Sequence, residues 1–279
     1  MSVREVIIPI LGRGSRLWPA SGVIPKELLP IGINPLLTYS IQEAVTSGIT
    51  DIHVLTNSPL IEHFLSDSNP AINARVSDST LESLAKLKNR ALLICHRMEK
   101  TNGLAEALYQ YRDFIQGNSF ALMFPDDIIF GEKAFLSELV KMHEIKFTNI
   151  IGLTRITTQD VKEFGVVEYQ KIDAGKYRLL SVVEKKVPAR IQSPLLGIIG
   201  RYILTRDIFP ILKSQLSGRS ADKFSLTPTL NRLAGNGSLL GVLNRQKYFH
   251  VGTEEGYIKA FLYYAKMRNA VKKTMHANV

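Results

Sequence analysis

The sequence contains a single cysteine among its 279 residues, and it lacks any long apolar run. Cys95 therefore cannot form a disulfide within the chain, and a metal cluster built on cysteine thiolates is excluded. The apolar letters around it, ALLICH, indicate a cysteine in a buried strand. No run reaches the roughly 18 apolar residues that a membrane-spanning helix needs. The apolar run near the start is too short, and too broken by proline, to be a signal peptide. We therefore expect a cytoplasmic protein that does not enter a membrane.

Acidic residues are fewer than basic ones, with 25 Asp and Glu against 35 Lys and Arg, so the formal net charge is +10. This balance suits an anionic partner, either a nucleic acid or a small phosphorylated ligand. The basic residues are spread along the chain, apart from EKK near the centre and KMRNAVKK at the end. The sequence has neither a zinc-finger nor an RNA-recognition motif. We expect a phosphorylated small molecule as ligand, and no nucleic acid.

Strand-like and helix-like segments alternate over about the first 155 residues. Apolar runs such as EVIIPIL, DIHVLTN and ALLICHR indicate buried strands, whereas LLTYSIQEAVTSG and GLAEALYQYRDFI have the pattern of helices. Strands that alternate with helices of this length predict crossover units and a mainly parallel sheet covered by helices on both faces. The expected fold class is therefore α/β, with a Rossmann-like mixed, mainly parallel sheet.

The pattern changes after residue 160. Two strand-like runs flank a turn at residues 173–175, which is typical of a β-hairpin. Further strands are expected in LLGIIGRYILT, SLLGVLN and KYFHVG, with helices over 206–217 and 255–269. The chain contains neither an internal repeat nor a linker-like stretch. We expect one domain over 1–279, with a first half of about 1–155 and a second half, 156–279, that ends in the C-terminal helix.

Three glycines lie in the stretch ILGRGSRLWPASGVIPKELLP that follows the first expected strand. A glycine-rich loop at this place lets backbone N–H groups approach phosphates or a base closely. The stretch is not a Walker P-loop, because the sequence Gly-Lys-Ser/Thr does not follow. It is not the dinucleotide-binding fingerprint either, because Leu17 occupies the position of the third glycine. Both of these nucleotide-binding classes are excluded.

The remaining pattern is G-x-G-S-R-x-x-P followed by P-K-E-L-L-P. This pair resembles the signature of the sugar-phosphate nucleotidyltransferases, usually written G-x-G-(T/S)-R-x-x-P and P-K-x-x-x-P. Later segments of the chain are similar to those of the bacterial UTP:glucose-1-phosphate uridylyltransferases of that family and occur in the same order and spacing. The segments are GLAEAL, FPDDII, FGVVEY, VVEKK, GRYILTRDIFPIL and VGTEEGYIKAFLYY. The resemblance covers nearly the whole chain.

The resemblance implies a reaction in which an oxygen of a sugar 1-phosphate attacks the α-phosphorus of a nucleoside triphosphate and pyrophosphate leaves. Because the substrate brings its own nucleophile, such a protein must hold two polyanions in line and neutralise their charge. The implied reaction is the synthesis of UDP-glucose from UTP and glucose 1-phosphate, on a nucleotide-diphospho-sugar transferase fold, with Mg²⁺ or Mn²⁺ and in a homo-oligomer. A thymidylyltransferase that uses dTTP is the alternative, because GLAEA is equally close to that version of the motif.

In the first half, the resemblance places a nucleotide against the glycine loop. The residues expected along the nucleotide and beside its base are Leu11, Gly12, Gly14, Ser15 and Gly103. Arg16 is expected to contact the pyrophosphate that leaves. Lys26 is expected at the reacting phosphates, where a point charge on a flexible stem suits a changing geometry. Glu106 departs from the uridylyltransferase version of the GLAEA motif, which often has histidine at this position.

Asp126, which ends an expected buried strand, matches the magnesium-binding aspartate of the family. The edge of an α/β sheet is where ligands bind, and a carboxylate suits a hard cation that bridges phosphate oxygens. Asp127 is either a supporting neighbour of this site or a turn residue, and the sequence leaves both interpretations open.

On the sugar side, Gly165, Glu184 and Lys185 match positions that hold the hexose and its phosphate. Glu184 can accept hydrogen bonds from sugar hydroxyls, and Lys185 can neutralise the 1-phosphate. We therefore expect the half that contains the hairpin to bind the sugar phosphate.

Several polar positions of the family pattern are not kept, and these departures are Gly22, Ile33, Lys223, Pro228 and His250. His250 matters most, because the family has there an aspartate that gives magnesium its second carboxylate. Imidazole is a poor ligand for magnesium and a better one for zinc, nickel or manganese.

Three interpretations of His250 stay open. It is a polar residue in a site that works with Asp126 alone, a metal ligand that shifts the metal preference, or the mark of an inactive or weakly active paralogue. Such a paralogue would bind nucleotide or UDP-glucose as a regulatory subunit. The charged residues of the family pattern that this chain retains favour an enzyme, since a scaffold has no physical need to bring them into one cleft. They are Arg16, Lys26, Asp126, Glu184 and Lys185.

Overall fold

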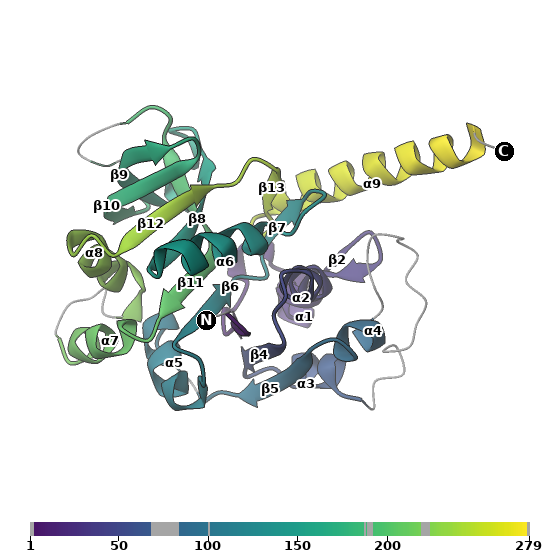
Figure 1. Ribbon diagram of the computed structural model, residues 1–279. Helices are drawn as coiled ribbons and strands as arrows, with labels where there is room; N and C mark the ends of the chain where they lie inside the picture. Colours follow the sequence, from purple (N-terminus) through teal and green to yellow (C-terminus); the bar gives the residue numbers. More distant parts are fainter. Residues whose placement is uncertain are drawn as a thin grey trace.

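A nine-stranded mixed sheet forms the centre of the protein (Figure 1). The computed structural model describes residues 3–67, 84–99, 101–186, 188, 192–218 and 224–277. The strands of the sheet are, from one edge to the other, β5 (Leu92–Arg97), β4 (Asp51–Thr56), β1 (Glu5–Ile10), β6 (Ser119–Met123), β11 (Leu196–Thr205), β8 (Asn149–Arg155), β12 (Leu239–Leu243), β10 (Lys176–Glu184) and β9 (Gly165–Asp173). Strands β11 and β10 run opposite to the others. The sheet is thus mixed and mainly parallel, as expected.

The two halves of the chain share this sheet. Strand β11 of the second half lies between β6 and β8 of the first half, and β12 pairs in parallel with β8. The expected hairpin is formed by β9 and β10, which pair antiparallel through a turn at Gly175. Gly175 has a φ of +79°, a left-handed conformation that glycine adopts without strain.

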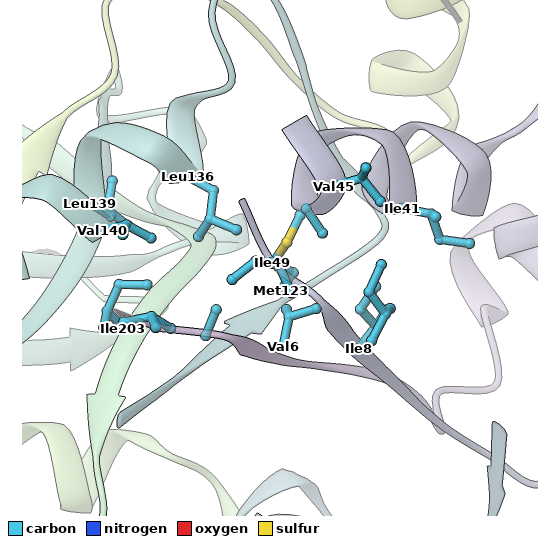
Figure 2. Close-up of a cluster of buried hydrophobic side chains, with 14 of the residues drawn as sticks. Val6, Ile8, Ile41, Val45, Ile49, Met123, Leu136, Leu139, Val140 and Ile203 are labelled. Carbon is cyan, nitrogen blue, oxygen red and sulfur yellow. The ribbon is translucent and has the colours of Figure 1, made fainter. Parts of the chain in front are cut away.

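Helices cover both faces because successive residues of a strand point to opposite faces. In β1, Val6 and Ile8 pack in one apolar cluster and Ile7 packs in the other. The first cluster, shown in Figure 2, is covered by α2 (Leu36–Thr46), α3 (Pro59–Leu65), α4 (Leu84–Lys88) and α6 (Phe135–Lys146). The second cluster is covered by α5 (Leu104–Tyr111), α7 (Ile208–Leu216) and α8 (Thr227–Gly235).

Short elements surround the edge of the sheet at which β1 and β6 end. The short strands there are β2 (Pro30–Ile31), β3 (Asn34–Pro35), β7 (Asp127–Phe130) and β13 (Lys247–His250), and the short helices there are η1 (Ser15–Leu17), α1 (Ala20–Val23), η2 (Lys26–Leu28) and η5 (Asp160–Glu163). The short helix η4 (Arg112–Phe114) follows α5 and lies near the start of β1. Helix α9 (Glu254–Ala277) packs its first turns on this region and then extends away from the body (Figure 1). Within the described residues, none of the helices is both long and apolar enough to span a bilayer.

Most elements lie where the sequence indicates, with four differences. The four-residue strand β7 and the helix α8 were not expected, because DIIF is very short and TPTLNRLAG is mostly polar. Helix α9 continues to Ala277, beyond the expected 255–269. The sequence Asn34-Pro35 predicts the cap and first turn of α2, but α2 begins at Leu36 because these two residues pair with β2.

Cys95 lies in a strand as expected, but it is only half-buried, since β5 is the edge strand. Burial and the nearby charge of Glu62 raise the pKa of its thiol to about 11. The thiol is therefore protonated at neutral pH and a poor nucleophile.

Candidate functional site

A cavity of about 380 Å³ opens where β1 and β6 end, at the carboxyl edge of the parallel strands. This is the edge at which α/β sheets bind ligands. Its walls come from the loop after β1, from η2, from residues 101–104 and from residues 124–126. Several residues expected from the sequence line it, and these are Leu11, Gly12, Lys26, Gly103 and Asp126.

The glycine loop forms a tight turn beside the cavity. Gly14 has a left-handed backbone with a φ of +65°, and its carbonyl accepts hydrogen bonds from the Ser21 hydroxyl and the Leu17 amide. A Cβ at Gly14 would lie 3.0 Å from the Ser21 Cβ, whereas a Cβ at Gly12 would meet nothing within 4 Å. Gly14 thus shapes the loop, and Gly12 leaves space for a ligand against the backbone.

Gly103 begins α5 at the opposite wall of the cavity. A Cβ there would lie 2.6 Å from the backbone oxygen of Phe224, so the two segments can approach this closely only because residue 103 is glycine. The loop before it is held by Glu106, whose Oε2 accepts hydrogen bonds from the backbone and side-chain nitrogens of Asn102 at 2.7 and 3.0 Å. The residue that departs from the family motif therefore fixes the rim of the cavity.

Lys26 and Asp126 meet at the floor of the cavity. The Lys26 ammonium donates a hydrogen bond to Asp126 Oδ2 and lies 3.7 Å from Glu27 Oε1. Burial alone would lower the pKa of Lys26, but the charges of Asp126 and Glu27 outweigh burial and raise it. The carbonyl of Asp126 accepts the Val251 amide at 2.7 Å, which ties the loop after β13 to the same place.

Asp127 lies at the start of β7, opposite His250 in the β7–β13 pair. It is buried, and both of its carboxylate oxygens have protein partners. Oδ1 accepts hydrogen bonds from His250 Nδ1 at 2.9 Å and from the Tyr248 hydroxyl at 2.5 Å, and Oδ2 accepts the Gly200 amide at 2.6 Å. Asp127 thus ends the turn that begins at Phe124, where its amide donates to the Phe124 carbonyl, and its side chain holds the ring of His250.

The orientation of His250 follows from this pair. Since the carboxylate of Asp127 can only accept, Nδ1 carries the proton and Nε2 points elsewhere. Nε2 is buried and has no hydrogen-bond partner within the described part of the chain. Burial would lower the pKa of His250, but its hydrogen bond to Asp127 and the charges of Asp127 and Asp126 raise it. The negative charges of Asp126 and Asp127 also attract a cation to this place.

The residues around Nε2 fit a divalent cation. Ligand atoms of Asp126, Asp127 and His250 lie within 4.8 Å of one another. A Cβ at Gly252 would lie 2.9 Å from Asp126 Oδ2 and 3.1 Å from His250 Nε2, so the missing side chain leaves room between these atoms. Asp127 is engaged by protein donors at both oxygens, and Asp126 shares Oδ2 with Lys26. The donors that remain are the Asp126 carboxylate and the His250 imidazole, a set that suits a borderline ion better than a purely hard one.

The open end of the β9–β10 hairpin faces the same region. Gly165 pairs with Glu184, whose Oε2 accepts a hydrogen bond from the Thr227 hydroxyl at 2.8 Å. Lys185 has a left-handed φ of 50°, and its amide donates to the Phe164 carbonyl. The Phe164 ring lies 6.0 Å from the His250 ring, centroid to centroid. The expected sugar-binding residues are thus next to the charged centre.

Arg16 does not line the cavity, and neither do Gly14 and Ser15. The guanidinium of Arg16 forms an ion pair with Glu163 of η5, with 2.6 Å between Nη1 and Oε2. This pair joins the glycine loop of the first half to the segment that precedes the hairpin. In this conformation the guanidinium of Arg16 is paired with Glu163 and is outside the lining of the cavity.

The other departures have local explanations where the structure describes them. A Cβ at Gly22 would lie 2.3 Å from the Trp18 ring, so Trp18 occupies the space that a lysine there would need. Ile33 is exposed in the turn between β2 and β3, and Pro228 lies in the first turn of α8 beside Thr227. Lys223 lies outside the described residues.

Arg201 is a supporting residue that the sequence reasoning missed. It is fully buried and donates hydrogen bonds to Glu43 Oε2 at 2.7 Å and to the carbonyls of Phe124 and Asp127 at 3.0 and 2.8 Å. It thereby holds both ends of the turn that carries Asp126. The available signal was a lone charge in the apolar run GIIGRYILT. Glu163 and Tyr248 were also missed, and nothing in their sequence context marks them.

Residues 6–267 match the family model described as nucleotidyl transferase. The chain is 32% identical to a UTP–glucose-1-phosphate uridylyltransferase of Mycoplasma pneumoniae, over 97% of this chain and 95% of that one. It is 31% identical to the enzyme of the same name from Bacillus subtilis, over 94% and 91%. Among solved structures, a UDP-glucose pyrophosphorylase complexed with UDP-glucose superposes with a TM-score of 0.82 at 26% identity, covering 95% of this chain and 99% of that one.

Proposed function

The chain belongs to the nucleotidyl transferase family, and we propose that it makes UDP-glucose and pyrophosphate from UTP and glucose 1-phosphate. One observation carries this proposal: at the carboxyl edge of the sheet, a cavity lined by the glycine loop and the part-buried Lys26–Asp126 pair lies next to His250, whose Nε2 has no partner in the described chain. Nucleotidyl transfer requires such an arrangement, because its transition state gathers negative charge on phosphate oxygens.

The nucleotide is held by the first half of the chain, about 1–155. The base lies between Leu11 and Gly103, and the phosphates run along the loop from Gly12 to Ser15, where backbone N–H groups and a short side chain can approach them. Lys26 donates to the α-phosphate and stabilises the charge that develops there. Arg16 leaves Glu163 and binds the pyrophosphate as it departs.

The sugar phosphate is held by the second half, about 156–279. Glu184 accepts hydrogen bonds from sugar hydroxyls, Lys185 neutralises the 1-phosphate, and Gly165 leaves space for the ring. These groups orient the phosphate oxygen of the sugar in line with the bond that breaks, which converts a bimolecular step into one within the complex.

Asp126 and His250 hold the divalent cation, which we propose to be Mg²⁺ or Mn²⁺. An ion bound there would neutralise charge on the phosphates. Asp127 fixes the His250 ring, so that Nδ1–H faces the Asp127 carboxylate and Nε2 is turned toward Asp126. Of the interpretations of His250, this arrangement favours a metal ligand that alters the metal preference of an active enzyme. It is less consistent with a site that binds the metal through Asp126 alone.

Two alternatives are separated by one assay. Pyrophosphate release is followed with glucose 1-phosphate and each of UTP, dTTP, ATP and CTP in turn, with Mg²⁺ or Mn²⁺. The proposal requires UTP to be the best substrate; a preference for dTTP indicates a thymidylyltransferase. If UTP binds but none of the four is turned over, the chain is a binding subunit. Asp126→Asn is expected to abolish turnover, and the exposed Asp113→Asn is the matched control.

A further inference from the structure

Two histidines and a tyrosine meet away from the cavity. His53 lies in β4 and pairs with Ile94 of β5; His96 is two residues further along β5, so both imidazoles leave the same face of the sheet. Tyr111, the last residue of α5, packs on that face between them. None of the three lines the cavity, and none is used in the proposed reaction.

Three polar atoms of this cluster converge on one point. The Tyr111 oxygen lies 2.7 Å from His53 Nδ1 and 2.8 Å from His96 Nε2, and the two nitrogens are 3.2 Å apart. Each ring nitrogen has one in-plane lone pair or one N–H, so it can face only one of its two neighbours. Hydrogen bonding alone does not require all three atoms to be mutually close, whereas a shared cation does.

We propose that His53, His96 and Tyr111 form a second metal site, which binds Zn²⁺ or a similar borderline ion. With zinc–nitrogen bonds of about 2.0–2.1 Å, tetrahedral ligands lie about 3.3 Å apart. The two nitrogens are close to this separation at 3.2 Å, whereas the Tyr111 oxygen, at 2.7 and 2.8 Å from them, must move outward when the ion binds. Imidazole nitrogens and a phenol oxygen suit Zn²⁺ better than Mg²⁺. His96 is half-buried, which leaves the ion a route from solvent.

The surroundings of His53 support the assignment. Its other nitrogen, Nε2, lies 4.0 Å from Glu5 Oε2, and Glu5 is itself held by the amides of Gln116 and Gly117. At this distance the Glu5 carboxylate does not accept a hydrogen bond from His53, but its negative charge adds to the potential that attracts a cation.

The test is a Zn²⁺ titration of the untagged full-length chain in competition with a chromophoric chelator. It is done in a His250→Asn background, so that the imidazole near the cavity does not contribute. We expect one Zn²⁺ per chain, bound at least about tenfold more weakly after Tyr111→Phe or His96→Asn. His63→Asn, which changes an exposed histidine outside the cluster, is the matched control and leaves binding unchanged.

Tyr111→Phe keeps the ring that stacks on Phe114, so this variant tests the site even if His96→Asn fails to fold. Absence of Zn²⁺ binding, or equal binding by all the variants, overturns the proposal and leaves a hydrogen-bonded network only. The readout is binding, so it is independent of whether the chain makes UDP-glucose.

Discussion

The carboxylate of Asp127 and the imidazole of His250 face each other across the β7–β13 pair, with 2.9 Å between Oδ1 and Nδ1. The strand register sets this contact, because Asp127 and His250 are directly opposed residues. The contact turns Nε2 toward Asp126 and leaves it without a protein partner in the described chain. His250 thus presents an imidazole nitrogen next to the carboxylate of Asp126.

Replacing His250 by aspartate is expected to favour magnesium. A carboxylate is a harder ligand, so the Mg²⁺ concentration that gives half the maximal rate falls about tenfold. His250→Asn, which removes the imidazole without adding a charge, is expected to lower the rate with Mg²⁺ and with Mn²⁺. Rates of pyrophosphate release over a titration of each metal provide the measurement. If His250→Asp behaves like the wild type throughout the Mg²⁺ titration, residue 250 does not contact the metal.

Glu163→Gln is expected to release Arg16 for the triphosphate. The Arg16–Glu163 pair is largely exposed, and exposed pairs contribute about 0.2–1 kcal/mol, so KM for UTP falls by up to about fivefold while kcat changes little. Steady-state kinetics at low salt measure this. Glu62→Gln breaks another exposed pair, with Arg97, and is the control. A higher KM in Glu163→Gln would mean that the pair closes the site and does not compete with the nucleotide.

Arg201→Met is expected to destabilise the fold by about 3–5 kcal/mol, because it leaves Glu43 as a buried charge without its partner. The double variant Arg201→Met with Glu43→Met removes both charges and is expected to recover part of this loss. Urea unfolding of the three variants gives the free energies. A single variant as stable as wild type would show that Arg201 does not hold the turn that carries Asp126.

Stability is expected to fall above about pH 10, partly because of Tyr202. Burial, followed by the charges of Asp127 and Glu184, raises the pKa of its hydroxyl above the ordinary value near 10. Above that pH the unfolded chain loses the proton and the folded chain keeps it, so the unfolded state is favoured increasingly. Tyr202→Phe removes this contribution, and its melting temperature is expected to decline less between pH 9 and pH 11 than that of wild type. Parallel declines would contradict the assignment.

The fold was largely predictable from the sequence, because apolar strand runs and helix-like segments alternate strongly. The expectation failed for β7, whose four residues are stabilised by pairing with β13, more than a hundred residues later in the chain. Local patterns cannot report such a pairing. The order of the strands in the sheet could not be predicted for the same reason, since β11 lies between β6 and β8 through pairings between segments that are distant in the sequence.

The candidate site was predictable where a motif names the residue. The structure brings Lys26, Asp126 and His250 together, and their roles in binding and catalysis stay predictions. The role of Asp127 could not be deduced, because both of its oxygens are engaged by residues far along the chain. The Arg16–Glu163 pair was not predictable for the same reason: it spans 147 residues of sequence.

Pyrophosphate release from UTP, with and without glucose 1-phosphate and in the presence of Mg²⁺ or Mn²⁺, tests the proposed reaction most directly. We expect release that requires both substrates and the metal, forms UDP-glucose in equal amount, and is lost in Asp126→Asn. Absence of release at protein concentrations that bind UTP, with either metal, would contradict the proposed reaction.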